Sequence, residues 1–225
     1  MEQLKEGFRF IYHTELFRWL LGLTFIGMFF SQSYTQIMPV FTDLLGTDET
    51  GYGYLLSAGG LGSVVGTLLI GMVQESRRLG LIMLGGAAGS VLFLVMFAST
   101  SGLQSLPLAL LLAFLVAASA SAFMIISMTV LQLEVPDALR GRVMGIHTIG
   151  YSLAPLGGLF LGALADGLGA AWAVIIGSGV FLLAIAATTL GKPSIRNLDG
   201  RSLQTTLPGE SATGKSANDQ PAAAR

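Results

Sequence analysis

The chain has 225 residues, of which 52% are hydrophobic and 11% charged, and its mean hydropathy is +0.71. Soluble domains carry about 25% charged residues, so this composition excludes an ordinary water-soluble fold and predicts an integral membrane protein. The net charge of −1 does not indicate a nucleic-acid ligand, and the absence of cysteine excludes disulfides and thiolate metal sites.

Residues 1–16 place Leu4, Phe8, Ile11 and Tyr12 at helical spacing, with Lys5 and Arg9 beside them. This pattern is typical of an amphipathic helix that lies at the membrane interface, here predicted on the cytoplasmic side. The alternative is a connector to a segment further upstream.

Six charge-poor stretches follow, each long enough to cross a bilayer, which needs about 20 mostly apolar residues. The interval between Arg78 and Glu134 is twice that length and divides at the polar stretch 99–107. Transmembrane β-strands would alternate over segments of about ten residues, whereas these apolar runs are continuous. The sequence therefore predicts an all-α bundle with spans at 17–42, 51–74, 79–98, 106–133, 143–165 and 170–191. Residues 192–225, rich in Ser, Thr, Gly, Pro and Ala, are predicted to be a disordered cytoplasmic tail.

Basic residues predict the orientation of these spans. With both termini in the cytoplasm, all ten Lys and Arg residues near span ends lie inside, as the positive-inside rule requires. They are Lys5, Arg9, Arg18, Arg77, Arg78, Arg140, Arg142, Lys192, Arg196 and Arg201. The only charged residues near the predicted outer loops are then the acids Asp43, Asp48, Glu49 and Asp166.

The two triplets of spans are predicted to form a 3+3 inverted repeat, an arrangement common among transporters. A shift of 91 residues superimposes three glycines and one acid of the first triplet on the second. The pairs are Gly59 with Gly150, Gly66 with Gly157, Gly71 with Gly162, and Glu75 with Asp166. Chance alignment of glycine-rich helices is the alternative.

Four segments carry a family resemblance. QSYTQIMP (32–39) and GYGYLLSAGGLG (51–62) resemble the seventh and eighth helices of major facilitator superfamily transporters, in particular the group of enterobactin-type siderophore exporters and macrolide exporters. VPDALRGRVMG (135–145) is similar to the connection between their tenth and eleventh helices. Residues 71–78 resemble the superfamily's loop motif of a glycine, an acid and paired basic residues.

This resemblance implies the C-terminal six-helix half of a twelve-helix fold in a bacterial inner membrane. It implies efflux of a small organic molecule, drug-like or siderophore-like, by alternating access driven by an ion gradient. The chain is then a half-length or truncated transporter that pairs with a second six-helix half or with itself. The alternative is a non-transporting assembly partner or an inactive remnant. No phosphate-binding loop, nucleophile arrangement or metal-ligand cluster indicates an enzyme, a cofactor or a metal.

Candidate gating residues follow from the same resemblance, since loops of this kind make charge contacts between helix ends in one gate state. They are Gly71, Glu75, Arg77 and Arg78 after the second span, and Glu134, Arg140 and Arg142 after the fourth. The alternatives are simple membrane anchoring and a solvated turn.

Candidate cavity-lining residues are the polar groups inside the spans: Gln32, Tyr34, Gln36, His147 and Tyr151. Gln32 and Gln36 are four residues apart and share a helix face. His147 is the only ionisable side chain within a predicted span apart from tyrosines, which makes it a candidate for a proton or substrate role. The alternatives are hydrogen bonding between helices and, for His147, hydration near the inner surface.

Glycine pairs at four-residue spacing predict close helix packing. They are Gly62 with Gly66, Gly85 with Gly89, and Gly158 with Gly162. Pro39 and Pro155 are predicted to kink their helices.

Overall fold

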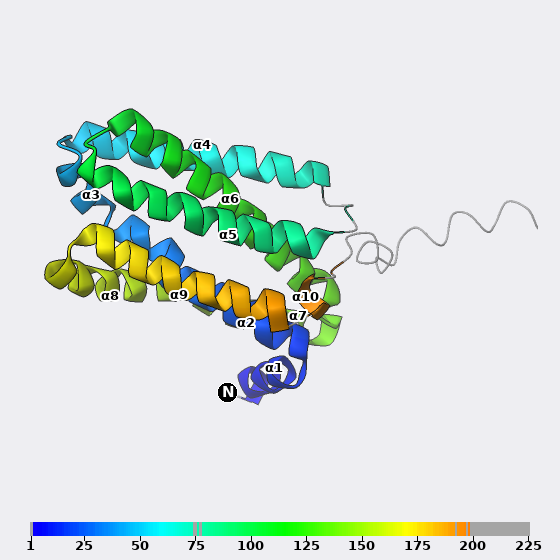
Figure 1. The fold of residues 1–225 in the computed structure, drawn as a ribbon. Coiled ribbons are helices and arrows are strands. Elements are labelled where there is room, and N and C mark those ends of the chain that lie inside the picture. The colour runs from blue at the N-terminus through cyan, green and yellow to red at the C-terminus, as the bar shows by residue number, and fades with distance from the viewer. Residues whose placement is uncertain (1, 74–75, 77, 192, 197, 199–225) are drawn as a thin grey trace, which may run out of the picture.

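The computed structural model describes residues 2–73, 76, 78–191, 193–196 and 198, and every regular element within them is a helix (Figure 1). The elements are α1 (Glu2–His13), α2 (Glu15–Ile26), the π-helical turn η1 (Gly27–Ser31), the 3-10 segment η2 (Gln32–Gln36), α3 (Met38–Leu44), α4 (Glu49–Val73), α5 (Leu79–Ser99), the 3-10 turn η3 (Thr100–Gly102), α6 (Leu106–Glu134), α7 (Asp137–Ile149), the 3-10 turn η4 (Gly150–Ser152), α8 (Leu153–Leu168), α9 (Ala170–Gly191) and α10 (Pro193–Arg196).

Five continuous helical stretches in the described part of the chain are long and apolar enough to cross a membrane. They are Glu49–Val73, Leu79–Gly102, Leu106–Glu134, Asp137–Leu168 and Ala170–Gly191. Each overlaps one of the last five spans predicted from the sequence. The all-helical membrane bundle is therefore confirmed, whereas the inverted repeat stays a prediction.

The first predicted span, 17–42, is not one helix but the segmented run α2–η1–η2–α3, which extends along the bundle in Figure 1. The interruption before α3 has a local cause at Pro39. Proline cannot donate a hydrogen bond to the carbonyl four residues earlier, and its ring clashes with that carbonyl. The backbone accordingly leaves helical geometry at Ile37, where φ is −101° and ψ is 7°. The kink expected at Pro39 is thus a complete break.

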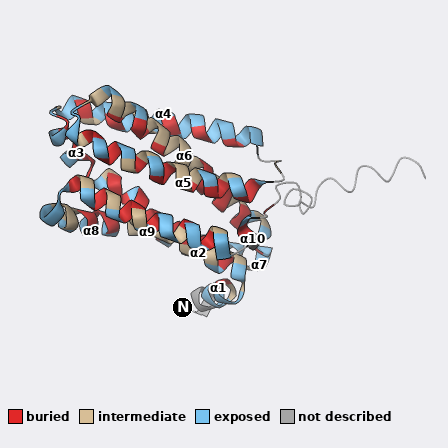
Figure 2. Ribbon diagram, viewed as in Figure 1, coloured by how far each residue is buried: buried red, intermediate tan, exposed pale blue. Residues whose placement is uncertain are grey.

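The helices pack in a sequence of neighbours: α4 on α6, α6 on α5, α5 on α9, and α9 on α8. α4 is outermost, and Figure 2 shows how much of it is exposed. α1, α7 and α10 lie at one end of the bundle, and α3 lies at the other (Figure 1). The sequence predicts disorder from residue 192 onward, but Pro193–Arg196 are helical and Ile195 is buried. The rest of that predicted tail lies outside the described residues, except Leu198.

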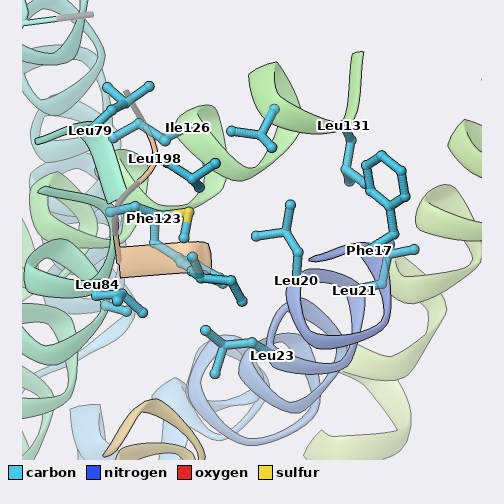
Figure 3. Close-up of a cluster of buried hydrophobic side chains, with 14 of the residues drawn as sticks. Phe17, Leu20, Leu21, Leu23, Leu79, Leu84, Phe123, Ile126, Leu131 and Leu198 are labelled. Carbon is cyan, nitrogen blue, oxygen red and sulfur yellow. The ribbon is translucent and has the colours of Figure 1, made fainter. Parts of the chain in front are cut away.

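Two clusters of buried side chains form the core. Near the α1 end, Phe17 of α2 lies beside Leu131 of α6, and Leu20 of α2 belongs to the same cluster as Phe123 of α6 and Leu84 of α5 (Figure 3). Near the α3 end, the rings of Tyr34 and Phe41 pack on Phe97, with centroid distances of 6.0 Å and 5.1 Å. Because lipid tails are as apolar as these side chains, close packing rather than water exclusion holds such helices together.

Candidate functional site

A cavity of about 400 Å³ lies between η2, α4 and α6. Its wall combines apolar side chains with hydroxyl groups and one amide, a mixture suited to a largely apolar ligand that carries a few polar groups. The lining residues are Gln32, Tyr34, Thr35, Met38, Leu55, Leu56, Gly59, Gly60, Ser63, Thr67, Val116, Ala117, Ala120, Ser121, Met124 and Ile125.

Two glycines set the position of α4 beside this cavity. A Cβ atom at Gly62 would collide with the backbone carbonyl of Phe114, and one at Gly66 with that of Ala118. Only glycine permits this approach of α4 to α6. The next residue in each case, Ser63 or Thr67, then lines the cavity.

The cavity hydroxyls of α4 and α6 donate to backbone carbonyls four residues earlier in their own helices. Ser63 donates to Gly59 at 3.1 Å, Thr67 to Ser63 at 2.8 Å, and Ser121 to Ala117 at 2.9 Å. A hydroxyl that donates in this way keeps lone pairs free to accept. The α4 and α6 side of the cavity therefore presents acceptors to a ligand.

Two of the predicted lining residues, Gln32 and Tyr34, border this cavity, and Gln36, His147 and Tyr151 do not. The side chain of Gln36 instead covers Gly158, where a Cβ would lie 2.6 Å from Gln36 Cβ. Sequence reasoning missed Ser63 and Thr67 altogether. Their position directly after Gly62 and Gly66 is the signal that identifies them, since neighbours of a packing stripe lie at its edge.

Exposed polar side chains occur at several positions inside the predicted spans of η2, α4, α7 and η4. Polar groups facing hydrocarbon are costly, because lipid offers no hydrogen bonds. We refer to seven of these residues as the polar set: Gln32, Gln36, Ser63, Thr67, Thr148, Tyr151 and Ser152; Tyr54 and Ser57 of α4 are exposed as well.

A close crossing joins the segmented first span to α8. The Ser33 hydroxyl lies 2.8 Å from the carbonyl of Ala154 and 2.5 Å from that of Phe29. Gly157 lies against the Phe29 carbonyl and the Ser33 hydroxyl, with no room for a Cβ. The irregular backbone of η1 and η2 is thus held against the fifth span.

The remaining predicted packing glycines differ in their surroundings. No heavy atom outside its own helix backbone lies within 4 Å of a Cβ built at Gly85 or at Gly162, and at Gly89 the nearest is the Ser119 hydroxyl oxygen at 3.4 Å. Gly86 rather than Gly85 lies close to α6, since a Cβ built at Gly86 would lie 2.7 Å from the Ala122 methyl group.

His147 is buried, with 2% of its surface exposed, and neither ring nitrogen has a hydrogen-bond partner among the described residues. Its ring meets the edge of the Tyr151 ring, with centroids 5.8 Å apart and an interplanar angle of 78°. Tyr151 itself is 55% exposed.

The predicted charged gating residues that the structure describes lie at the α1 and α10 end of the bundle (Figure 1). Arg140 pairs with Asp137 at 2.7 Å, and Arg142 pairs with Glu6 of α1. Neither arginine pairs with Glu134, which is exposed, in the part of the chain that the structure describes. Arg142 therefore links α7 to α1, and Gly7 permits the contact, since a Cβ there would lie 3.2 Å from Arg142 Cβ.

Of the other predicted gating residues, the structure describes Gly71 and Arg78. Gly71 and Arg78 are exposed, and the backbone N–H of Arg78 donates to the Ser76 hydroxyl at 3.2 Å. Glu75 and Arg77 lie outside the described residues.

Asp48 stands at the start of α4, at the other end of the bundle. Its carboxylate accepts hydrogen bonds from the backbone N–H groups of Thr50 and Gly51, at 3.0 Å and 3.2 Å. These bonds, that from Gly51 first, hold the pKa of the Asp48 carboxyl below its usual value. Among the described residues, no group of three His, Asp or Glu side chains is placed to hold a metal ion.

The sequence profile of the Major Facilitator Superfamily matches residues 20–213. The chain is 30% identical over 200 residues to the multidrug efflux pump Tap of Mycolicibacterium fortuitum, covering 86% of this chain and 47% of the pump. It is 28% identical over 171 residues to the enterobactin exporter EntS of Shigella flexneri, covering 76% of this chain and 38% of the exporter. The chain thus spans less than half the length of these relatives, and no solved structure matches it. It belongs to the major facilitator superfamily.

Proposed function

We propose that this chain forms one half of an efflux transporter that moves a small organic molecule out of a bacterial cell by alternating access, driven by an ion gradient. The cavity between η2, α4 and α6 carries the proposal. Its volume of about 400 Å³ falls in the range of small-molecule pockets. The names of the relatives, a multidrug pump and a siderophore exporter, support a drug-like or siderophore-like substrate.

A second six-helix bundle completes the site in this proposal. Substrate sites of such transporters lie near the bilayer midplane, at the interface between repeated units. The polar set supports this interface, because exposed amides and hydroxyls suit a protein or water-filled surface better than hydrocarbon. The second bundle is either a separate chain or another copy of this one. The alternative is a membrane protein that assembles with a partner without transporting.

We propose that both termini face the cytoplasm and that α1 lies along the inner membrane surface. The position of α1 and α10 at one end of the bundle supports this orientation (Figure 1). Phe8 and Tyr12 are exposed on α1 beside the exposed Arg9, as expected for a helix in the headgroup layer. The two charged loops, from Gly71 to Arg78 and from Glu134 to Arg142, are the proposed cytoplasmic gate.

Single-cysteine labelling in intact cells tests the orientation, because the natural chain contains no cysteine. A membrane-impermeant maleimide should label Glu49→Cys in intact cells and Ser211→Cys only after the membrane is permeabilised. Labelling of Ser211→Cys in intact cells would contradict the proposed topology.

Flux in sealed inverted vesicles tests the transport function, with ethidium as the probe. Vesicles with this chain alone are compared with vesicles that also contain the product of an upstream reading frame encoding six similar helices. Gradient-driven accumulation is expected only when both are present. Ser63→Leu should lower it at least about tenfold by filling the cavity, whereas Leu182→Ile on the exposed face of α9 should not. Flux from the chain alone, with crosslinking that shows monomers, would contradict the need for a second bundle.

A further inference from the structure

The residues that follow the sixth span lie against the bundle at its α1 end, and we refer to Pro193–Arg196 and Leu198 as the strap (Figure 1). Ile195 is 1% exposed and Leu198 is 9% exposed, and both belong to the same buried cluster as Leu79 of α5 (Figure 3). α10 packs against α2, α5 and α9, which belong to the first, third and sixth predicted spans. The strap therefore ties together three spans that do not follow one another directly in the chain.

The strap supplies backbone carbonyls to the first turn of α5. The Gly80 N–H donates to the Leu198 carbonyl at 3.3 Å. The first N–H groups of a helix need an acceptor from outside it, and the N-cap residue of α5, Arg78, provides no side-chain cap. A Cβ atom at Gly80 would collide with the Ile195 carbonyl. Glycine at this position is therefore what allows the strap to reach the start of α5.

The first proposed gating loop, from Gly71 to Arg78, leads directly into this contact. Arg78 precedes Gly80 by two residues and is the N-cap of α5. Its backbone N–H donates to the Ser76 hydroxyl at 3.2 Å, so the end of the loop is joined to the start of the helix. Fixing Gly80 therefore limits where this part of the loop can lie.

The other end of the loop belongs to α4, which is held less firmly there. Of residues 67–73, Ile70 alone is buried. Elements with few buried contacts open more easily than the core does. The position of the loop therefore depends on how the start of α5 is held rather than on the end of α4.

We propose that the strap is a positioning element of the cytoplasmic gate. Ile195 and Leu198 hold the start of α5 against α2 and α9, so that the gating loop keeps a defined position. This inference rests on the proposed function, and no strap residue lines the cavity between η2, α4 and α6. A segment that merely anchored the end of the chain would stabilise the whole bundle, whereas the proposed strap acts on the loop.

Double electron–electron resonance on the full chain in lipid nanodiscs tests this positioning without any substrate. The natural chain contains no cysteine, so spin labels attach only at introduced cysteines. An inner pair joins Arg78→Cys to Leu190→Cys, and an outer pair joins Glu49→Cys to Trp172→Cys, all at exposed positions. The inner pair reports the end of the gating loop, and the outer pair reports whether the bundle is intact.

Two variants release the strap from opposite sides of its contact. Ile195→Ser removes the buried side chain, and Gly80→Val places a side chain against the Ile195 carbonyl. Each should widen the distance distribution of the inner pair at least about twofold and leave the outer pair unchanged. The matched controls are Arg196→Ser, at an exposed residue of α10, and Gly85→Val, at a glycine of α5 with open space around it. Neither control should change either pair.

Two results would overturn the proposal. One is an unchanged inner pair in both release variants. The other is equal widening of both pairs, because the strap would then stabilise the bundle as a whole. Ile195→Ala shortens the side chain without adding a polar group, and it decides the question by the same criteria if the other two variants do not fold.

Ethidium accumulation in the two-component vesicles tests the effect on transport. Ile195→Ala should lower the maximal rate at least about threefold and leave the KM for ethidium within about twofold, because gating motions limit the rate and the strap lies outside the cavity. Ile195→Val retains most of the buried side chain and should restore the rate. A wild-type maximal rate in Ile195→Ala, or a change confined to KM, would overturn the gating role. If the unmodified components show no flux, the proposed transport function fails, and the resonance distances alone decide whether the strap positions the loop.

Discussion

α9 and the elements that carry the polar set both expose much of their surface, but they expose different chemistry. Every exposed residue of α9 is apolar or glycine. Its hydroxyl side chains Ser178 and Thr188 are buried and Thr189 is partly buried. Thr188 donates to the Ala184 carbonyl at 2.8 Å and Thr189 to the Ile185 carbonyl at 2.7 Å. On η2, α4, α7 and η4, in contrast, amides and hydroxyls reach the surface. The comparison indicates that α9 has a surface suited to lipid, whereas the polar set has one suited to water or protein.

This difference matters because hydropathy alone treats both regions as membrane spans. A helix whose polar groups all face the protein interior needs no further hydrogen-bonding partner in lipid. A helix with exposed amides is stable there only if another surface covers them. The polar set therefore supplies the physical reason to expect a partner bundle on one side of this molecule.

The largest effect is expected at the contact between Gly62 and the α6 backbone, which holds α4 in place. Gly62→Leu forces a side chain into the backbone of α6, which cannot move aside as a side chain can, and should destabilise the bundle by about 3 kcal/mol or more. The matched control is Gly85→Leu, at a glycine with open space around it. Unfolding in mixed micelles of increasing SDS content measures both. Equal losses would show that α4 is not held by this contact.

An arginine placed on the exposed face of α9, and another in the polar set, test whether the two surfaces differ in their contact with lipid. Leu183→Arg puts a guanidinium on the exposed face of α9 and should cost about 2.5–3.5 kcal/mol of membrane insertion. Ser63→Arg on α4 should cost less when the second bundle is present, although it should abolish flux. The membrane-inserted fraction after alkaline extraction measures the cost. Equal losses of insertion would mean that Ser63 also faces lipid.

The crossing of the first and fifth spans should respond to loss of one hydroxyl. Ser33→Ala removes the hydrogen bond to Ala154 and should destabilise the bundle by about 1 kcal/mol. The control is Thr148→Ala, because the exposed Thr148 hydroxyl donates only to Met144 in its own helix. The same unfolding assay applies, and a control loss as large as that of Ser33→Ala would argue against the crossing as the cause.

The smallest effect is expected at the first turn of α4. The folded-state pKa of Asp48 is lowered, so its contribution to stability is present above the unfolded pKa of about 3.8 and is lost as pH falls through the lower folded value. Amide hydrogen exchange at residues 50 and 51, corrected for intrinsic rates, should be constant from pH 7 to about pH 4 and faster below. Asp48→Asn should remove this acid step.

The spans were predictable because each depends on its own residues. The intervals without charge around α5, α6 and α9 agree with the continuous helices found there. The first span was less predictable. Pro39 predicts a break in the helix, but nothing in the residues Gly27–Ser31 indicates a π-helical turn. Such a turn depends on what packs around it, including the Phe181 ring beside Gly27.

The candidate site illustrates the same limit residue by residue. Gln32 and Gln36 share one sequence signature, yet Gln32 borders the cavity and Gln36 covers Gly158. Gly62 and Gly66 contact a neighbouring backbone, whereas Gly85 has the same spacing and no such contact. Spacing identifies a shared helix face but does not say which neighbour that face meets.

The sequence by itself determined that the chain is a membrane protein, where its last five spans lie and which family it resembles. These properties follow from the cost of placing charges in hydrocarbon and from local residue order. The tertiary structure alone decided which polar side chains border a cavity, which glycines permit contact and which histidine is buried. Those outcomes depend on the register between helices far apart in the chain, because contacts such as Ser33 with Ala154 join residues that no local pattern relates.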